Sequence, residues 1–575
     1  MRTLFFLLFS ASCFAQTSPK IHLNQEGFYI NAPKIAILTN IDNTGLFYVM
    51  GNNGDTVFRG QISAPEKSKN SSLICRTLNF SELNQPGNYR VFVPGTGSSY
   101  PFTISDHAYL KTATATLKGY YFLRASMPIE AQYGGQWSRP AGHPDDKIEI
   151  HPSAATDKRP AGTIVSSPGG WYDAGDYNKY IVNSGITMGT LLSAYEDFPA
   201  HFDKLKTQIP ESGNQLPDII DELLYNLRWM LTMQDPNDGG VYHKCTNAEF
   251  DGMVMPGVTK LPRYMVQKST AATLDFVAVT AQAARVLRKF DKILPGLSDS
   301  CRNAAINAWQ WAIRNPGLLY HQAELNKKFE PKINTGAYGD GNLKDEWFWA
   351  ASELFVTTRD KTYELWIIDK LEGTVRLVSW NSVGLAGAYS MIRNEKNLPP
   401  NFINNLATIK TRVKEFADSL LSRQQATAFR TVMGGSAKDF EWGSNGVAAN
   451  QGIALMNAYF ITKEKKYLEA ALSNADYILG RNATGYCFIT GAGSRSPMHP
   501  HHRPSVADGI ADPVPGLVAG GPNPGRQDGC KYEFTEPETS YTDDDCSYAS
   551  NEIAINWNAP VVYLLNGLEF LLSQK

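Results

Sequence analysis

The pattern of apolar residues changes near residue 106, and this change constrains what the chain can fold into. Before it, apolar and polar residues alternate over short runs, and turn residues such as Pro86-Gly87-Asn88 separate these runs. The runs lie at 34–38, 46–50, 57–62, 73–78, 89–93 and 100–104. Such alternation is the period of a β-strand with one buried face. Residues 16–105 are therefore expected to form a small all-β sandwich.

After residue 106 the apolar residues follow a helical period instead. The segment 217–234 begins with a proline and an acidic first turn, and it places Ile220, Leu223, Leu224, Leu227 and Leu231 along one stripe. Similar segments occur at 270–290, 299–314, 345–357, 402–424, 447–461, 465–479 and 553–572. A chain of 575 residues exceeds what one core holds, so a second, all-α domain is expected over 106–575.

The first fifteen residues have the composition of a secretory signal peptide. Arg2 precedes the apolar run from Leu4 to Phe9, and the small residue Ala15 follows as a cleavage position. We therefore expect export, to a periplasmic, cell-surface or secreted location. A lipid-modified Cys13 is the alternative, and Ser10 is a poor residue three places before such a site. No other segment has the length and apolarity of a membrane span.

Charge and cysteine content exclude several classes of protein. The chain has 54 basic and 56 acidic residues, which is no nucleic-acid footprint. We expect a monomer that binds no nucleic acid. No Cys-x-x-Cys pair is present, so a zinc ribbon or redox motif is not expected. Cys530 and Cys546 share one loop-rich stretch, where a disulfide and two buried free thiols are equal alternatives.

Two acidic motifs lie in long Gly- and Pro-rich loops, where functional residues often gather. The first, 169–178, contains Asp173 and Asp176, and the second, 541–552, ends at Glu552. Cleavage of a glycosidic bond needs one protonated and one ionised carboxyl group. The apolar residues after Glu552 favour the protonated form, and Asn551 is placed to cap the last helix. The alternatives are a turn or calcium loop at 173–176 and a helix-dipole role for Glu552.

A third stretch, 488–504, contains His499, His501, His502 and Arg503. Such a cluster beside acidic loops suits sugar hydroxyl groups. A metal site is the rival interpretation, and no set of Cys or acidic ligands is interleaved to support it.

Together these three stretches resemble glycoside hydrolase family 9, the inverting cellulases. The resemblance rests on Gly170–Asp176, on Gly493-x-Arg495 with 501–503, and on 541–559. It implies an immunoglobulin-like β-sandwich at 16–105 followed by an (α/α)6 barrel at 106–575. It also implies Asp176 as general base, Asp173 as the residue that positions the water, and Glu552 as general acid. Asp543 would support the water or the acid.

The resemblance implies further residues in the cleft. His501 and Arg503 would bind the sugar near the scissile bond, and His243 lies in a loop that faces the cleft in the family. Candidate sugar-facing aromatic residues are Trp171, Tyr264, Trp442 and Tyr541. Core packing is the alternative for each of them.

The sequence gives different expectations for zinc and for calcium. Some relatives bind zinc through two cysteines and two histidines before the first acidic motif, but residues 131–170 contain His143, His151 and no cysteine, so no zinc is expected. The stretch 335–347 resembles the calcium loop of the family, with Asp340, Asp345 and Glu346 as ligands. The alternative is an acidic helix N-terminus without an ion. No organic cofactor is expected.

The sequence thus predicts an enzyme that hydrolyses β-1,4-glucosidic bonds of cellulose or related β-glucans with inversion, most simply as an endoglucanase. An exo-acting cellodextrinase or cellobiohydrolase is the alternative, because the insert at 126–168 is placed to block one end of a cleft. The other hypotheses are a hydrolase of the same fold that acts on another sugar, such as an amino sugar or xyloglucan, and a non-catalytic glycan-binding protein. Inversion requires carboxyl groups about 6.5–9.5 Å apart.

Overall fold

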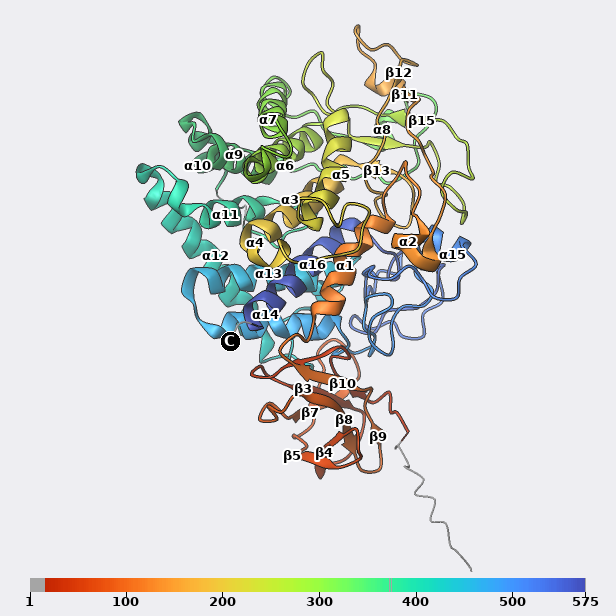
Figure 1. Cartoon of the computed structure of the whole chain (residues 1–575), viewed down its shortest axis with the longest axis vertical. Helices are drawn as coiled ribbons and strands as arrows, with labels where there is room; N and C mark the ends of the chain where they lie inside the picture. The colour runs from red at the N-terminus through yellow and green to blue at the C-terminus, as the bar shows by residue number, and fades with distance from the viewer. Residues whose placement is uncertain (1–15, 372, 374, 574–575) are drawn as a thin grey trace, which may run out of the picture.

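The computed structural model describes residues 16–371, 373 and 375–573, so the expected signal peptide and Cys13 lie outside the described residues. Figure 1 shows a β-sandwich at one end of the molecule and a much larger helical body at the other. The last sandwich strand ends at Ser105, and the first helix begins at Leu110.

Two sheets form the N-terminal sandwich, as the alternation predicts. One sheet has the order β1-β3-β7-β6, and the other β2-β10-β8-β4-β5, with β9 beside β8. The strands are β1 Ile21–His22, β2 Gly27–Tyr29, β3 Ile35–Thr39, β4 Leu46–Gly51, β5 Thr56–Gln61, β6 Glu66–Lys67, β7 Ile74–Asn79, β8 Gly87–Val93, β9 Gly97–Ser98 and β10 Phe102–Ser105. In β8 the buried residues Tyr89, Val91 and Val93 alternate with partly exposed ones and face the core between the sheets.

Twelve helices of the described residues form an (α/α)6 barrel, which confirms the predicted fold class. The outer helices are α1 Leu110–Phe122, α5 Asp218–Thr232, α7 Leu297–Arg314, α10 Glu364–Lys370, α12 Ile403–Gln424 and α14 Lys465–Ile478. The inner helices are α3 Ile181–Asp197, α6 Thr270–Leu287, α9 Lys344–Thr358, α11 Gly384–Arg393, α13 Ser444–Thr462 and α16 Ile555–Leu572. The chain alternates between the two rings, and each inner helix packs against an outer partner.

The distribution of apolar residues along each helix distinguishes the outer ring from the inner ring. The outer helix α12 buries one stripe, made by Leu406, Ile409, Val413, Ala417 and Leu420, and exposes the rest to solvent. The inner helices α6 and α13 are buried on nearly every side, because neighbours surround them. A helix that is apolar all round belongs inside a domain, and this distinguishes the inner ring.

A small sheet lies within residues 106–575, for which the sequence predicts helices and no strands. Its order is β12-β11-β15-β14-β13, from Ile164–Val165, Ile148–Ile150, Arg263–Met265, Lys244–Thr246 and Lys179–Tyr180. The carboxylate of Asp145 fixes the insert 126–168 to this sheet through ion pairs with Lys179 at 2.7 Å and Arg263 at 3.0 Å. Burial alone would raise the pKa of Asp145, but the two cations lower it to about 2. The insert is therefore held firmly beside the barrel.

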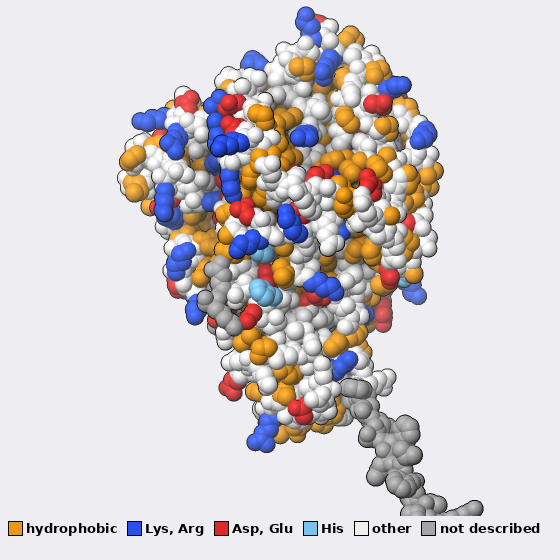
Figure 2. Space-filling view, in the orientation of Figure 1, with side chains coloured by type: hydrophobic (Ala, Val, Ile, Leu, Met, Phe, Trp, Pro, Cys, Tyr) orange, Lys and Arg blue, Asp and Glu red, His pale blue; other side chains and the backbone are white. Residues whose placement is uncertain are grey.

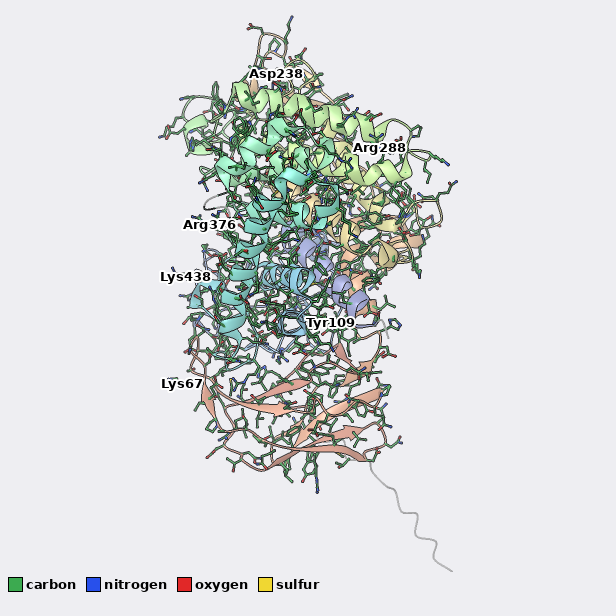
Figure 3. The ribbon with its side chains drawn as sticks, turned by 90° about the vertical axis from the view of Figure 1, so that its left-hand side faces the viewer. Lys67, Tyr109, Asp238, Arg288, Arg376 and Lys438 are labelled. Atoms are coloured by element: carbon green, nitrogen blue, oxygen red, sulfur yellow. A yellow bond between two sulfur atoms is a disulfide. The ribbon has the colours of Figure 1, made fainter. Side chains whose placement is uncertain are left out.

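The sandwich contacts the barrel through polar side chains at their junction. Tyr109, which Figure 3 places between the strands and the helices, donates to Asp476 at 3.0 Å. Asn24 donates to the same carboxylate at 2.7 Å. Gln25 accepts from the backbone N–H groups of Ser494 and Arg495, both at 2.9 Å. The sandwich therefore supports the loop that leads into the His/Arg stretch.

Candidate active site

All the functional loops lie at one end of the barrel. The motif with Asp173 and Asp176 precedes inner helix α3, and Glu552 precedes inner helix α16. Tyr338, Trp380 and the loop at 440–443 likewise precede inner helices α9, α11 and α13. Because the inner helices run parallel in this topology, their N-terminal ends meet at one rim, and long loops there build a site on a rigid scaffold.

A cavity of about 650 Å³ lies at this rim, and Asp173, Asp176 and Glu552 all line it. The backbone N–H of Ile555, the first residue of α16, donates to the carbonyl oxygen of Asp173 at 2.9 Å. This bond joins the two acidic motifs directly, although nearly four hundred residues separate them. The structure thus brings the three predicted carboxyl groups into one cavity.

Hydrogen bonds hold the two aspartates in different ways. Asp173 accepts from Asn183 through Oδ1 and from Tyr338 through Oδ2, each at 2.7 Å. Asp176 accepts from Asn178 at 2.6 Å and from Tyr180 at 3.0 Å, both through Oδ2. Within the described residues, Oδ1 of Asp176 is therefore the oxygen that remains to bind a water. Burial and the charge of Asp176 raise the pKa of Asp173 to about 8.

Glu552 stands in the loop before α16 and not in the helix itself. The helix begins at Ile555 with Ala554 as its N-cap, so the expected capping role of Asn551 is wrong. Asn551 instead donates to the carbonyl oxygen of His499 at 2.6 Å. Burial, followed by the charges of Asp176 and Asp173, raises the pKa of Glu552 well above its ordinary value. A protonated carboxyl group is what a general acid requires.

The His/Arg stretch packs under the first acidic motif. Arg503 donates from Nη1 to the carbonyl oxygen of Gly175 at 2.7 Å and from Nε to that of Asp251 at 2.9 Å. A Cβ on Gly175 would meet the carbonyl oxygen of His501 at 2.2 Å, so only glycine permits this packing. Arg503 is buried, and its charge acts on Glu552.

His501 and Asp543 lie beside the cavity and not on its wall. His501 Nδ1 lies 2.6 Å from the carbonyl oxygen of Asp545, which only accepts, so Nδ1 carries the proton and Nε2 is left as an acceptor. Asp543 accepts from the backbone N–H groups of Met498 and His499 at 2.9 Å and from Asn551 at 3.1 Å. Asp543 therefore joins the acidic and His/Arg loops and reaches Glu552 only through Asn551.

Of the predicted sugar-facing residues, the structure places Trp442 in the cavity wall with 43% of its surface exposed. Trp171 is fully buried and donates to Glu222 at 2.7 Å, so its prediction was wrong: it anchors the motif in the core. His243 is also fully buried, between Ser269 and the carbonyl oxygen of Ala337. It supports the cavity wall from behind, so the prediction that it binds substrate in the cleft was also wrong.

Tyr264 and Tyr541 also lie away from the cavity wall. Tyr264 is in strand β15, where its ring packs against His151 at 5.8 Å. Tyr541 is 7% exposed and borders a separate groove between the sandwich and the barrel. Neither side chain is placed to face a sugar in the cavity.

Several functional residues escaped the sequence reasoning. Tyr338 and Tyr180 hold the two aspartates, and Trp380 and Phe250 add aromatic surface to the cavity. Trp380 packs edge-on against Tyr338 at 5.4 Å. Its signal was available, because Trp380 precedes α11 by a few residues just as Trp442 precedes α13.

Tyr338→Phe is expected to lower kcat/KM by about tenfold to a hundredfold while the protein stays folded. Its hydroxyl group donates to the buried carboxyl group of Asp173, and leaving such a buried group without its partner costs about 1–3 kcal/mol. Steady-state kinetics and a thermal melt check this. Tyr459→Phe, on α13 outside the cavity wall, is the matched control. Equal activity of the two variants would refute a role for the Tyr338 hydroxyl group.

The predicted calcium ligands form part of a buried acidic cluster. Asp340, Asp345 and Glu346 lie with Asp275 of helix α6, and burial together with mutual repulsion raises the pKa of Asp275 and of Glu346 well above their ordinary values. Both carboxylate oxygens of Asp275 and of Glu346 lack a hydrogen-bond partner in the part of the chain that the structure describes. In the same part, no three or more His, Cys, Asp or Glu side chains form a ready-made metal cage. The donors suit a hard cation, although the cage is not preformed.

The acidic loop carries a disulfide between Cys530 and Cys546, which decides between the two alternatives for these cysteines. Asp528 lies two residues before the disulfide loop and accepts from the hydroxyl groups of Tyr532 at 2.8 Å and Ser547 at 2.7 Å, one on each side of Cys546. The neighbouring Gln527 lines the cavity. The disulfide therefore fixes a loop that forms part of the site.

The surface carries charges of both signs. Figure 2 shows Lys and Arg interspersed with Asp and Glu on the face in view. Among the described residues, no helix has the length and apolarity needed to span a bilayer.

Comparison with known proteins connects this geometry to a family. Residues 109–565 match Glycosyl hydrolase family 9, and residues 16–98 match the Cellulase N-terminal ig-like domain. The chain is 46% identical over 552 residues to the xyloglucan-specific endo-beta-1,4-glucanase BoGH9A of Bacteroides ovatus, covering 96% of this chain and 94% of that protein. It is 33% identical over 558 residues to Endoglucanase D of Acetivibrio thermocellus, covering 96% of this chain and 84% of that protein.

A solved structure described as Bacteroides ovatus GH9 superposes with a TM-score of 0.92 at 45% identity, covering 96% of this chain and 99% of that chain. The two matched domains fall on the sandwich and on the barrel, and the carboxyl groups that carried the resemblance line the cavity. The chain belongs to glycosyl hydrolase family 9 and is a glycoside hydrolase.

Proposed function

We propose that this enzyme is an endo-β-1,4-glucanase that cleaves the backbone of a β-1,4-glucan with inversion. One observation carries the proposal: Asp176, with an oxygen left to bind water, and Glu552, with a raised pKa, line the same cavity. Their environments differ in the way that acid and base roles require.

The reaction proceeds in one displacement. Glu552 donates its proton to the glycosidic oxygen as the bond from that oxygen to the anomeric carbon breaks. A water bound at Asp176 Oδ1 attacks the anomeric carbon from the opposite face and gives its proton to Asp176. Asp173, held by Asn183 and Tyr338, positions that water. The expected separation of the carboxyl groups is about 6.5–9.5 Å, which leaves space for the water.

The cavity wall supports a polymeric substrate. Trp442 is 43% and Phe250 is 47% exposed, and both offer aromatic faces to sugar rings. The most informative relative acts on xyloglucan, as its name states, so we extend the proposal to xyloglucan as a substrate. The insert 126–168, which the exo-acting alternative requires as a blocking loop, contributes no residue to the cavity wall.

A substrate panel tests this proposal. Xyloglucan, carboxymethyl cellulose and cellohexaose are digested over time, and viscosity and products are followed. A fast fall in viscosity with mixed oligosaccharides is expected. Cellobiose or glucose as the main early product would support the exo-acting alternative. Binding to all three glucans with no product would support a non-catalytic glycan-binding protein.

We propose calcium as a structural ion held by Asp340, Asp345 and Glu346 beside Asp275. The unpartnered buried carboxylate oxygens support this proposal, because a cation would neutralise them. The ion would stiffen the loop that carries Tyr338, and hydrolysis itself needs only the acid and the base.

Removal of calcium is expected to lower the melting temperature more at pH 8 than at pH 5. The raised pKa values of Asp275 and Glu346 mean that the metal-free folded state binds protons that the unfolded chain releases. Its stability therefore falls as pH rises above about 4, and calcium restores it. At about 100 times the Kd, the ion adds about 2.7 kcal/mol. Differential scanning calorimetry in EDTA and in calcium measures this.

Glu346→Gln should remove the calcium effect, and Glu324→Gln, an exposed change outside the cluster, should keep it. Identical melting temperatures with and without calcium at both pH values would contradict the calcium proposal.

We also propose that the enzyme is exported and acts as a monomer. The signal-like composition of residues 1–15 supports the first of these, and size-exclusion chromatography with light scattering tests the second.

A further inference from the structure

A lysine is buried behind the proposed general base. Lys244 is fully buried in strand β14, where its direct partner on β13 is Tyr180. Its Nζ donates to Gln322 Oε1 and to the carbonyl oxygen of Gly336, both at 2.7 Å, and to Thr335 Oγ1 at 3.0 Å. Within the described residues, no ion pair joins Lys244 to a carboxylate.

The surroundings of Lys244 suit a charged ammonium group. An ammonium has three N–H donors and no acceptor, and four oxygen acceptors surround Nζ at hydrogen-bond distance, the fourth being the carbonyl oxygen of Thr335 at 3.4 Å. Nζ also lies 5.4 Å from the ring centroid of Tyr180 and 5.6 Å from that of Tyr320, and such ring faces attract a cation. Burial lowers the pKa of Lys244 well below its ordinary value, and the charge of Asp176 opposes this shift in part.

A short path connects this charge to Asp176. The Tyr180 ring under the ammonium carries the hydroxyl group that donates to Asp176 Oδ2 at 3.0 Å. A cation on the ring face withdraws electron density and makes the hydroxyl group a stronger donor. Lys244 also holds Thr335 and Gly336, the start of the loop that presents Tyr338 to Asp173. The lysine therefore reaches both aspartates without touching either.

Other charged groups also surround Asp176, and among them is the cation of Arg503, which donates to the carbonyl oxygen of Gly175 beside it. Asp173 and Glu552 are acidic neighbours, and each feels the charge of Asp176. Burial lowers the pKa of His501. Arg503 acts on Glu552 and His501. Lys244 adds a cation on the Tyr180 side of Asp176.

We propose that Lys244 is a positioning residue of the reaction, whose buried ammonium group lies on the Tyr180 ring and strengthens the hydrogen bond that Tyr180 donates to Asp176. This inference rests on the proposed role of Asp176 as general base. It assigns to strands β13 and β14 a task beyond scaffolding, because their pairing places the ammonium group on the tyrosine ring.

The test is the pH profile of kcat/KM on xyloglucan for wild type, Lys244→Met and Lys244→Arg. Lys244→Met keeps the apolar stem and removes the charge. The acidic limb of its pH profile is expected to move to higher pH by about one unit. At pH values below this limb, kcat/KM should therefore be about tenfold lower than that of the wild type, while KM stays within about twofold. Lys244→Arg keeps the charge and should keep the limb near its wild-type position. A purely structural lysine would lower activity equally at every pH, and this result would overturn the proposal.

A second variant covers the case in which Lys244→Met does not fold. Tyr180→Phe removes only the hydroxyl group and should move the acidic limb in the same direction. If both single variants fold, the shift of the double variant should be smaller than the sum of the two single shifts, because both act on one path. Fully additive shifts would overturn the path through Tyr180.

Asp176→Asn distinguishes a failure of the proposal for Lys244 from a failure of the proposed function. If that variant is inactive and Lys244→Met shows an unmoved limb, the proposal for Lys244 fails and the proposed function stands. If Asp176→Asn keeps near-normal activity, the base assignment itself fails.

Discussion

Replacing Glu552 with glutamine is expected to lower kcat/KM on xyloglucan by about 10²–10⁴-fold, the usual contribution of general acid–base catalysis. The leaving group is a sugar alkoxide, which departs only with a proton. Glutamine keeps the size and polarity of the side chain but carries no acidic proton. The raised pKa of Glu552 shows that its surroundings favour the protonated form, which the glutamine variant imitates in shape alone.

A second substrate identifies the acid role specifically. In an aryl cello-oligosaccharide, the dinitrophenolate leaving group departs without protonation. Glu552→Gln should therefore retain most of its activity on that substrate. Asp544→Asn, an exposed change in the same loop, is the matched control and should behave like wild type on both substrates. Equal losses on the polysaccharide and on the aryl substrate would show that Glu552 does not act as the acid.

Asp176→Asn is expected to lower activity by a similar factor, but on both substrates. Without an ionised carboxylate the water is not activated, and a better leaving group does not replace the nucleophile. Asparagine keeps the oxygen that accepts from Asn178 and Tyr180, so the loop should remain in place. Kinetics on the two substrates and a thermal melt measure this.

Asp157→Asn, an exposed change in the insert 126–168, is the control for Asp176→Asn. If Asp176→Asn hydrolyses the aryl substrate at the wild-type rate, the base lies elsewhere. The pair of variants therefore assigns the two carboxyl groups separately, because only the acid variant responds to the leaving group.

The helices were predictable because their signal is local. The stripe of α12 and the segment 217–234 each repeat every three or four residues, and the structure begins and ends these helices within a few residues of the predicted bounds. The small sheet near the site was not predictable, because its strands have two or three residues and pair across the chain. Runs that short carry no period.

The carboxyl groups of the site could be predicted from the sequence, but the other side chains that line the cavity could be predicted less well. Asp173, Asp176 and Glu552 stand in motifs that resemble a family, and all three line the cavity. Trp171 stands beside them in sequence yet is buried, because a glycine-rich loop needs an aromatic anchor in the core. Residue type alone does not tell which side of a loop faces the substrate, so Trp171 and His243 were misplaced and Tyr338 was missed.

The most direct measurement is the anomeric form of the first product, followed by proton NMR during rapid hydrolysis of cellohexaose. A water activated by Asp176 opposite the proton donor Glu552 gives the α-anomer first, and the β-anomer then grows by mutarotation. Initial formation of the α-anomer is the result predicted here. Initial formation of the β-anomer would require a covalent intermediate and would contradict the arrangement of acid, water and base proposed for this cavity.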